Sequence, residues 1–539
     1  MSPERIYARR WWILAVLCLS LVIMGMDASI LNVALPTLAR DLHAGSSALQ
    51  WIVDAYTLVF ASMLLTAGSL GDRSGRRWAL IGGMSIFGIG SVLAAFSGST
   101  ALLIASRGLM GVGGALAMPA TLSILTNVFP PEERAKAIGI WAGVFGIGIV
   151  AGPTLGGWLL GRFWWGSVFL VNVPVIAIAL TAGWFLVPDS RDPHAPRVDV
   201  LGTVASILGL TGVLYGIIEA PSRGFTNPAV AGTFAAGLAV LAVFVVWELR
   251  TEHPMLDVRF FANPRFSAAS ASITLMFFAL MGVMFFISQY LQSVLGYSPL
   301  RAGVGFLPLA AGMMISSLNS VRIAAWLGTK ITVAAGMVLA ASGVGLLSTA
   351  GTRSSYALIA TVLAMVGLGI GAAMSPATDS IMGSLPVEKA GIGSAMNDTT
   401  REVGGALGVA VLGSITSAAY RGQLGASAAF THLPASAQGM ARGGIGNALA
   451  IAGQLPRPAA AALTTASRSA FVHGVSTTSV AGAAIILLGA LVALLWLPAR
   501  AAGGVPELAA GAAVIADAPV GRRADGGFPV PALVAAGEV

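Results

Sequence analysis

The sequence predicts an all-α polytopic membrane protein that crosses the bilayer fourteen times. Hydrophobic residues make up 56% of the 539 residues and charged residues only 10%, whereas a soluble domain carries about a quarter charged residues. The apolar residues fall in repeated runs of about 20, the length that spans a hydrocarbon core about 30 Å thick. These runs lack the residue-by-residue alternation of a transmembrane β-barrel. The composition therefore disfavours both a soluble enzyme and a barrel.

The spanning segments begin close to the N-terminus. They are expected at residues 11–33, 50–70, 78–97, 101–126, 137–160, 165–187, 200–218, 229–249, 267–290, 300–319, 326–349, 356–380, 394–418 and 475–497. The first follows three arginines and stays apolar to about Val33 without a small-residue cleavage site. It is therefore interpreted as a membrane helix and not as a signal peptide.

The distribution of Lys and Arg predicts the orientation of these helices. Loops on the side of the N-terminus are rich in basic residues. The short loops on the opposite side hold only Arg40, Arg162, Arg223, Arg301 and Arg353. Since basic residues collect in cytoplasmic loops, both termini are expected in the cytoplasm. The net charge of +8 is accordingly read as a topology signal and not as a nucleic-acid surface.

The chain repeats itself, because the same ordered motifs occur in its fourth and twelfth helices and before its third and eleventh helices. The matching strings are Gly114-Ala115 with Gly371-Ala372, Pro119-Ala120-Thr121 with Pro376-Ala377-Thr378, and Gly75-Arg76-Arg77 with Gly328-Thr329-Lys330. The repeat predicts two pseudo-symmetric six-helix bundles with two helices inserted between them. Duplicated halves are common in secondary transporters, whose substrate site lies near the midplane between them.

This repeat sets the expected domain boundaries. The N-terminal bundle covers residues 1–187, the inserted helices lie within 188–266, and the C-terminal bundle covers 267–498. Within the last bundle, residues 419–474 are rich in Ala, Gly, Ser and Pro and are expected to form a long external loop, at most partly helical. Residues 499–539 are expected to be a disordered cytoplasmic tail.

The loop between the second and third helices combines small, acidic and basic residues. Its marked positions are Gly68, Asp72, Arg73, Gly75, Arg76 and Arg77. The glycines permit a tight turn, the arginines anchor a cytoplasmic face, and the carboxylate can pair with an arginine or lie at a helix N-terminus. A topology anchor alone would also explain these residues.

The fifth helix carries glycines at four-residue spacing. The string comprises Gly148, Gly152, Pro153, Gly156 and Gly157. Glycines four apart line one face of a helix and let another helix approach closely, while proline weakens the local backbone hydrogen bonding and favours a bend. A plain packing face is the alternative interpretation.

These two strings resemble the cytoplasmic loop signature of the major facilitator superfamily and the antiporter motif of its drug exporters. With residues 27–36 and 397–405 they resemble the fourteen-helix drug:proton antiporters, a branch that includes quaternary-ammonium exporters. The resemblance covers about residues 10–420 and again the last helix. The sequence departs from that pattern at Ser29, where the family often has threonine, and at Met110, where it often has glutamine. The resemblance implies export, and a loop that acts as a latch during alternating access.

Charged side chains inside the predicted helices are candidates for function. Placing an ionised group in the bilayer centre costs about 2.5–3.5 kcal/mol on insertion scales. At 1.5 Å per residue, Asp27 and Arg107 lie at similar depth in the outer half of the bilayer, so they are expected to reach each other. A fixed ion pair is one interpretation. The other is a carboxylate that exchanges a proton for a cationic substrate, with Asp54 of the second helix in coupling or cation recognition.

A second charged cluster is predicted in the C-terminal half. Asp398 and Glu402 are four residues apart with Arg401 beside them, and Asp379 lies near the inner end of the twelfth helix. We expect a gate network around Arg401, with a snorkelling interfacial cluster as the alternative. The cavity is harder to assign: Tyr56, Met281, Phe285 and Gln289 are candidates because Met and aromatic surfaces accommodate varied apolar bodies and attract cations. Lipid-facing packing is the alternative for each.

The sequence as a whole predicts a proton-coupled antiporter that exports lipophilic, often cationic drugs or antibiotics across the cytoplasmic membrane by alternating access. Its expected partners are small amphipathic substrates, protons and the lipid bilayer, while a periplasmic adaptor stays open. No phosphate-binding loop, HExxH pair or nucleophile elbow is present, so neither an enzyme nor a cofactor is expected. The histidines lie in loops or at helix ends and Cys18 is the only cysteine, so no metal site is expected. A dedicated exporter of one antibiotic or metabolite, an uptake symporter, and a membrane enzyme or channel are the alternatives.

Overall fold

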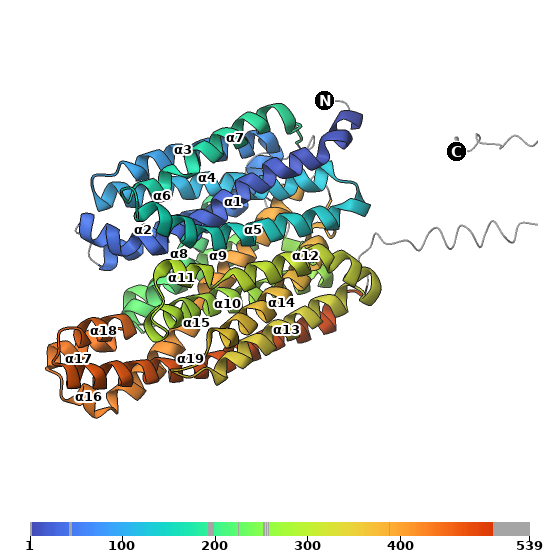
Figure 1. Cartoon of the computed structure of the whole chain (residues 1–539). Helices are drawn as coiled ribbons and strands as arrows, with labels where there is room; N and C mark the ends of the chain where they lie inside the picture. Colours follow the sequence, from blue (N-terminus) through green and yellow to red (C-terminus); the bar gives the residue numbers. More distant parts are fainter. Residues whose placement is uncertain are drawn as a thin grey trace, which may run out of the picture. The chain divides into compact units, whose positions relative to one another are not determined.

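The computed structural model describes residues 3–42, 46–191, 199–224, 226–251, 254, 256, 258–386 and 389–499. In these residues the secondary structure is helical, without strands. Fourteen segments are long and apolar enough to cross a membrane, which confirms the predicted all-α, fourteen-helix fold (Figure 1). The predicted tail lies, from residue 500 onward, outside the described residues.

The N-terminal half consists of five long helices, a short one and a final spanning helix. These are α1 (Pro3–Asp41), α2 (Ser46–Ser74), α3 (Arg76–Ala95), α4 (Thr100–Val128), α5 (Pro131–Leu160), α6 (Ser167–Leu170) and α7 (Asn172–Leu186). The inserted pair follows as α8 (Val200–Arg223) and α9 (Pro228–Arg250), with the short helix η1 (Val258–Ala262) behind it.

The C-terminal half repeats this plan with additional short helices. Its elements are α10 (Pro264–Gln289), the π-helical turn η2 (Tyr290–Val294), α11 (Pro299–Val304), α12 (Leu307–Leu327), α13 (Thr329–Leu346), η3 (Leu347–Thr349), α14 (Tyr356–Met382), α15 (Ala390–Gly425), α16 (Ala428–Thr431), α17 (Ala435–Arg442), α18 (Ile445–Ala452) and α19 (Arg457–Trp496). Several of these begin with proline in the first turn, where its missing N–H costs nothing.

The two halves pack their helices in the same pattern. In the first, α1 packs on α5, α2 and α3 pack on α4, and α7 packs on α1 and α3. In the second, α10 packs on α15, α12 and α13 on α14, and α19 on α10 and α13. A Cβ at Gly83 of α3 would lie 2.6 Å from the Gly113 carbonyl oxygen of α4, and one at Gly336 of α13 would lie 2.5 Å from that of Gly369 in α14. The duplication predicted from sequence is thus present in the helix packing.

The inserted helices lie along one seam between the halves. Helix α8 packs on α2 from the first half and on α15 from the second, and Leu65, Leu210 and Ala395 belong to one buried cluster there. The opposite seam is formed by α5 against α11, α12 and α14. In it the Ser317 hydroxyl donates a hydrogen bond of 2.8 Å to the Gly139 carbonyl oxygen.

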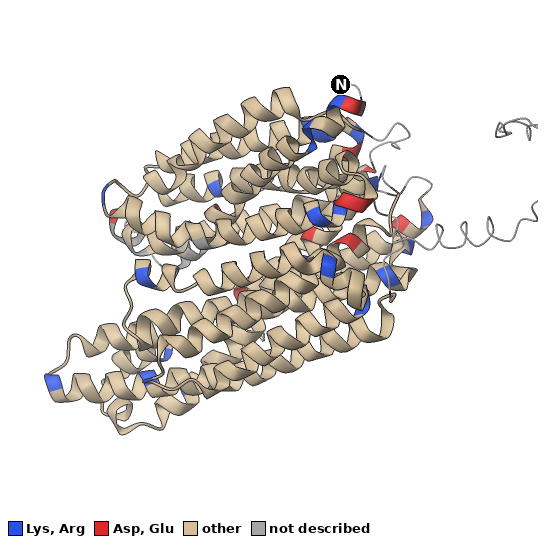
Figure 2. Ribbon diagram, turned by 45° about the vertical axis from the view of Figure 1, so that its right-hand side comes forward, with Lys and Arg blue, Asp and Glu red and all other residues tan. Residues whose placement is uncertain are grey.

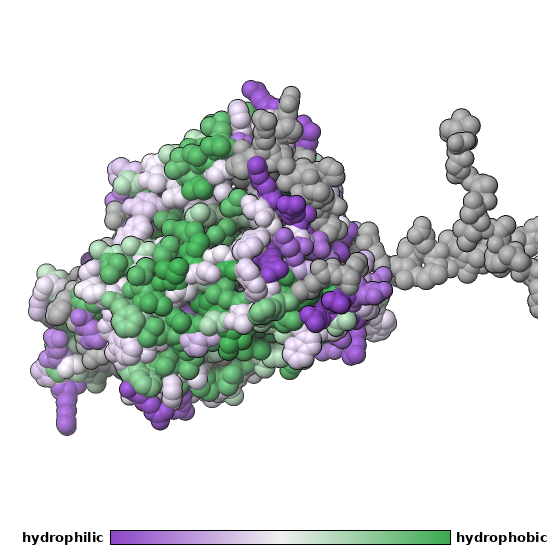
Figure 3. Space-filling view, turned by 90° about the horizontal axis from the view of Figure 1, so that it is seen from above, coloured by the Kyte–Doolittle hydropathy of each residue, from purple (hydrophilic) through white to green (hydrophobic). Residues whose placement is uncertain are grey.

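Charged residues concentrate at one end of the helical bundle, which we call the basic end. It contains the start of α1, the loop at residues 72–77, and the starts of α5, α13 and α15. Figure 2 shows most basic and acidic residues on this side, near the N-terminus. Between the polar ends, apolar side chains cover much of the surface seen in Figure 3, as expected for a surface that faces lipid tails.

The prediction of a mostly unstructured loop at residues 419–474 is wrong. Helix α15 continues to Gly425, α16, α17 and α18 follow, and α19 begins at Arg457. Alanine is the strongest helix former, and it dominates this segment, while Pro434 and Pro456 stand at the N-caps of α17 and α19. The Tyr420 hydroxyl donates to the Ala441 carbonyl oxygen at 3.2 Å, so the short helices pack back on α15.

Candidate functional site

The N-terminal half contains a buried ion pair between α1 and α4. The Arg107 Nη1 lies 2.5 Å from Asp27 Oδ2, and the two residues are only 2% and 0% exposed. The contact between Asp27 and Arg107, predicted from their similar depth in the bilayer, is therefore present in the structure. An ion pair at this burial is tolerable only where the remaining polar atoms also find partners.

Neutral groups complete the surroundings of this pair. The Arg107 Nε donates to the Ile52 carbonyl oxygen at 3.1 Å, and the guanidinium carbon lies 4.5 Å from the centre of the Tyr56 ring. Asn172 Nδ2 donates to Asp27 Oδ1 at 3.4 Å and lies 3.3 Å from Ser91 Oγ. One carboxylate thus faces one guanidinium and one amide.

Two candidate residues lie on α2, and one of them, Tyr56, contacts this pair. Tyr56 is buried and stacks on Phe60 with ring centres 5.6 Å apart, so it contributes to the wall around Arg107. Asp54 is half-buried on the same helix. Tyr56 was expected to line the cavity, and the structure places it against the ion pair.

Helix α5 holds α1, and hence Asp27, through its glycine face. A Cβ at Gly152 would lie 2.6 Å from the Met26 carbonyl oxygen and would overlap Ser29 Oγ, and one at Gly148 would lie 2.8 Å from the Val22 carbonyl oxygen. Gly156 meets Ile30 in the same way. Gly157 and Pro153 point elsewhere, toward Leu300 and Gly303 in the C-terminal half. This segment of α5 therefore packs on α1 with one face and on the C-terminal half with another.

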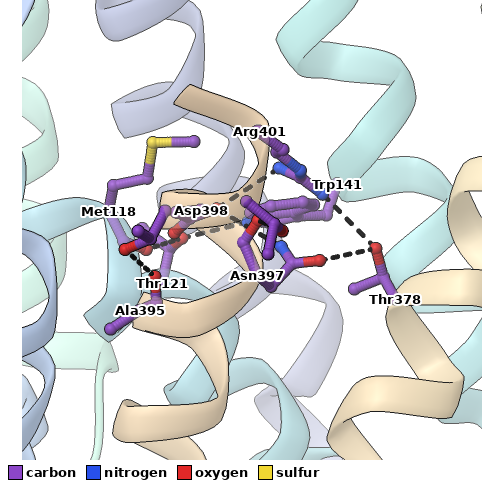
Figure 4. Close-up of polar contacts among 10 residues, drawn as sticks. Met118, Thr121, Trp141, Thr378, Ala395, Asn397, Asp398 and Arg401 are labelled. Atoms are coloured by element: carbon purple, nitrogen blue, oxygen red, sulfur yellow. Dashed lines mark hydrogen bonds and ion pairs between the residues drawn. The ribbon is translucent and has the colours of Figure 1, made fainter. Parts of the chain in front are cut away.

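The second charged cluster lies on α15, where Asp398, Arg401 and their neighbours form a network (Figure 4). Arg401 Nη1 is 3.4 Å from Asp398 Oδ1, and its Nη2 donates to Thr378 Oγ1 of α14 at 3.3 Å. The Thr378 hydroxyl donates to Asn397 Oδ1 at 3.1 Å, and Asn397 Nδ2 donates to Asp398 Oδ1 at 3.3 Å. Asp398 and Arg401 are 1% and 2% exposed.

The charged groups of this cluster are incompletely satisfied. Among the described residues, Asp398 Oδ2 and Arg401 Nε are buried without a hydrogen-bond partner, whereas in the first cluster the buried atom without a partner is the neutral amide oxygen of Asn172. Glu402, one residue further on, is half-buried, and in the described part of the chain neither a hydrogen bond nor an ion pair reaches its carboxylate. Arg401 is therefore paired with Asp398, and it acts on Glu402 only through its charge.

Two aromatic rings lie close to the Arg401 guanidinium. Its guanidinium carbon lies 4.8 Å from the ring centre of Trp141 and 5.5 Å from that of Phe277. Trp141 belongs to α5 of the N-terminal half, and its indole Nε1 donates to Thr121 Oγ1 of α4 at 3.0 Å. The charge on α15 is thus in contact with the opposite half.

Asp379 does not join the expected network around Arg401. No hydrogen bond or ion pair links the two residues among those described. The charges that act on the Asp379 carboxylate are Arg265 of α10 and Arg134 of α5, close to the basic end. Its position three residues before the end of α14 explains the difference, because the neighbouring Thr378 is the residue that faces α15.

The loop between α2 and α3 connects the two halves at the basic end. Asp72 accepts a hydrogen bond of 2.8 Å from Arg76 Nε and two from backbone N–H groups at the start of α15, Gly391 at 2.9 Å and Ile392 at 3.1 Å. A carboxylate at a helix N-terminus is stabilised by the unpaired N–H groups and the helix dipole. Asp72 of one half therefore caps a helix of the other.

The remaining loop residues shape this contact. A Cβ at Gly68 would lie 2.6 Å from the Gly391 carbonyl oxygen, so α2 and α15 approach closely. Gly75 has φ 111°, which only glycine adopts at low cost. Arg77 donates to the Trp184 carbonyl oxygen and lies over that ring, whereas Arg73 is exposed.

The predicted cavity residues on α10 have different surroundings. Met281 packs against Gly405, Phe285 is 44% exposed, and Gln289 Nε2 donates back to the Phe285 carbonyl oxygen at 3.4 Å. The apolar hollow between α5, α10 and α12 measures about 10 Å³ and is lined by Met284 instead. It is too small for a drug, since one water needs roughly this volume.

Several residues of these networks escaped the sequence analysis. Asn172 interrupts an apolar helix, and a polar residue in a membrane span is itself a signal for function. Asn397 stood inside the quoted helix string without an assigned role. Trp141 was not singled out, and Thr378 stood only in the repeated string, because a single sequence does not show which helix faces meet.

Comparison with known proteins places this geometry in a family. The sequence profile of the Major Facilitator Superfamily matches residues 17–409. The multidrug efflux pump LfrA of Mycolicibacterium smegmatis is 38% identical over 91% of this chain and 97% of its own length. The tetracenomycin C resistance and export protein of Streptomyces glaucescens is 33% identical over 93% and 94%, and the methyl viologen resistance protein SmvA of Salmonella typhimurium 32% over 89% and 97%.

A solved structure shares the fold. The crystal structure of the human organic anion transporter MFSD10 (TETRAN) superposes with a TM-score of 0.60, covering 92% of this chain and 100% of that one, at 14% sequence identity. At that identity the likeness extends to the fold alone. The profile match, the relatives and the duplicated bundles agree, and the chain belongs to the major facilitator superfamily.

Proposed function

We propose that this protein is a proton-coupled antiporter that exports lipophilic, often cationic drugs or antibiotics across the cytoplasmic membrane by alternating access, with both termini in the cytoplasm. Its relatives are named for multidrug efflux, for tetracenomycin C resistance and export, and for methyl viologen resistance. Methyl viologen is a dication, and buried carboxylates are the groups that recognise such a charge. The basic end is then the cytoplasmic end.

The observation that carries the proposal is the excess of carboxylates on α15. Arg401 pairs with Asp398, and its charge also acts on Glu402, so a fully ionised cluster of these three residues holds one uncompensated negative charge inside the membrane. Such a charge is costly and is neutralised by a proton or by a cationic substrate. Competition of the two for the same carboxylates gives antiport, because loading one requires release of the other.

From the sequence, Asp27 was either half of a fixed ion pair or the carboxylate that exchanges a proton for a cationic substrate. Its close ion pair with Arg107, at 2.5 Å, favours a role other than proton exchange. The exchangeable proton is assigned to Asp398 and Glu402, and Asp27 remains a candidate for recognition of the substrate's charge.

The Asp72 contact supplies the conformational part of the proposal. With both Asp72 oxygens on the first N–H groups of α15, the basic end is closed by a contact between the halves. Opening that end requires the contact to break, so the loop acts as the latch that the family resemblance implies.

Purified protein in vesicles with an imposed pH gradient tests the function directly. We expect ethidium and methyl viologen to move against the proton flow, and a protonophore to stop them. Glu402→Gln removes the surplus carboxylate and should reduce proton-driven transport at least tenfold, while Glu132→Gln at the exposed start of α5 should leave it unchanged. Vesicles that move no solute under the gradient would contradict the proposal.

The same vesicles separate the alternatives. A dedicated exporter would respond to one compound of a chemically varied panel and ignore ethidium. An uptake symporter would move substrate in the same direction as the protons. Export of the dication should be the first to fail in Asp27→Asn if that carboxylate recognises substrate charge.

A further inference from the structure

Trp141 is a large, fully buried aromatic residue to which the proposed mechanism assigns no task. It lies on α5, ten residues after the start of that helix, and Arg401 lies eleven residues after the start of α15. Both helices start at the basic end, so the two residues are at about the same depth, some 15 Å along each helix. They meet across the boundary between the two halves.

The ring of Trp141 is fixed where it can hold a cation. Its Nε1 donates to Thr121 Oγ1 at 3.0 Å, and the Thr121 hydroxyl donates to the Met118 carbonyl oxygen at 2.7 Å. This chain of hydrogen bonds, drawn in Figure 4, sets the orientation of the indole from the N-terminal half. The ring centre lies 4.8 Å from the Arg401 guanidinium carbon, within the range of a cation–π interaction.

Arg401 has few other partners in this state. Its Nη1 and Nη2 make long contacts of 3.4 and 3.3 Å, and its Nε makes none. A desolvated guanidinium with such weak hydrogen bonding depends on the rings that cover it, and indole is the strongest of the aromatic side chains for this purpose. The N-terminal half therefore supplies part of the stabilisation of a charge that belongs to the C-terminal half.

We infer that Trp141 is a positioning residue that links the closed basic end to the charge state of the α15 carboxylates. While the halves are closed, the ring stabilises Arg401 where it lies beside Asp398. When α5 moves away from α15, Arg401 loses this partner and depends on Asp398 and Glu402 alone, which strengthens its competition with a proton or a cationic substrate. This inference rests on the proposed function, but its core is a contact between halves that is measurable without transport.

Spin-label distances across the basic end test the contact. Labels at Glu132→Cys and Trp326→Cys, both exposed and from opposite halves, are placed in a Cys18→Ser background. Trp141→Leu should lower the ratio of closed to open protein roughly thirtyfold, the size expected for a desolvated cation–π contact. Trp141→Phe keeps an aromatic face and should lower it less, and Thr121→Val, which removes the acceptor of the indole N–H, should have an intermediate effect.

Two controls separate this role from plain packing. Trp158→Leu changes a half-exposed tryptophan of the same helix and should leave the distances unchanged. In an Arg401→Gln background, Trp141→Leu should have no further effect, because the partner charge is already gone. An equal shift in both backgrounds, or no shift in either, would overturn the inference, whereas failure of wild-type vesicles to transport would overturn only the proposed function.

The linkage has its own readout in transport. Protons released per ethidium moved should fall in Trp141→Leu and be largely restored in Trp141→Phe, with the rate of uncoupled downhill flux retained. An unchanged proton ratio with a uniformly lower rate would mean that Trp141 only supports the fold.

Discussion

The N-terminal half pairs one carboxylate with one guanidinium, Asp27 with Arg107 at 2.5 Å, and adds an amide and a backbone carbonyl as further partners. The C-terminal half has two carboxylates, Asp398 and Glu402, near one guanidinium. Only Asp398 pairs with Arg401, at 3.4 Å, and among the described residues Asp398 Oδ2 and Arg401 Nε have no hydrogen-bond partner. Both clusters are buried inside helices of one duplicated fold, so burial alone does not distinguish them. The difference is the charge balance.

A balanced buried pair and an unbalanced one have different consequences. The first is costly to disturb, because removal of either partner leaves an isolated charge. The second changes its charge with less disruption, because one carboxylate already lacks a counter-ion. This difference is the reason for proposing that the N-terminal pair supports the structure and recognises substrate charge, while the α15 cluster exchanges the proton.

The largest effect is expected for Arg107→Gln, which leaves Asp27 buried without its counter-ion. Breaking a buried pair costs about 3–5 kcal/mol, so thermal unfolding in detergent should show a large loss of Tm and of folded yield. The double variant Asp27→Asn with Arg107→Gln removes both charges and should recover much of the loss. Equal Tm values for Arg107→Gln and for the double variant would contradict the view that Arg107 and Asp27 form a balanced buried pair.

Gly152→Ala tests the packing that holds Asp27 on α1. The new methyl group would lie 2.6 Å from the Met26 carbonyl oxygen, and forced overpacking typically costs about 1–3 kcal/mol. Gly157→Ala is the matched control on the same helix, because its nearest neighbour in Leu300 lies 3.7 Å away. Melting curves should separate the two variants; coincident curves would remove the glycine face from the support of this pair.

A smaller effect is expected for Asp72→Asn, which removes the charge from the N-terminus of α15. Such an interaction is worth about 1 kcal/mol, so the ratio of open to closed basic ends should rise roughly fivefold. The spin-label pair on α5 and α12 measures it, with exposed Ser74→Ala as the control. The corresponding position in the C-terminal half is Ala325, which has no carboxylate. An unchanged ratio in Asp72→Asn would mean that the Asp72 charge does not stabilise the closed basic end.

The smallest change in stability is expected for Glu402→Gln. Removal of the surplus carboxylate leaves Asp398 and Arg401 balanced, so Tm should stay the same or rise slightly, even though proton-driven transport falls. Arg107→Gln, by contrast, should lower both the Tm and proton-driven transport. A destabilisation of Glu402→Gln as large as that of Arg107→Gln would show that the two clusters are equivalent.

The sequence predicted the fold well because a bilayer allows few solutions. Apolar runs long enough to span it must be helices, and the repeated strings around Pro119 and Pro376 identified the two halves. The meeting of Asp27 with Arg107 followed from depth along antiparallel helices. Contacts between the halves did not follow, because nothing in one sequence shows that Trp141 faces Arg401 or that Thr378, and not Asp379, faces α15.

The segment at residues 419–474 failed for a different reason. Alanine, glycine and serine are common both in loops and in helices outside the hydrocarbon core, so composition gave no decision. The structure decides it through tertiary contacts such as that of the Tyr420 hydroxyl with the Ala441 carbonyl oxygen, which no local pattern records.

These short helices have a practical consequence. The helices α16, α17 and α18 pack on α15 and α19. They lie beyond η3, where the Ser476 hydroxyl of α19 donates to the Ser348 carbonyl oxygen. Most of this protein is enclosed by detergent or lipid once purified, and such particles offer few landmarks for alignment in electron microscopy. An antibody fragment raised against α16–α18 would provide a fiducial rigidly attached to the C-terminal half, from which the tilt of the other half could be measured image by image.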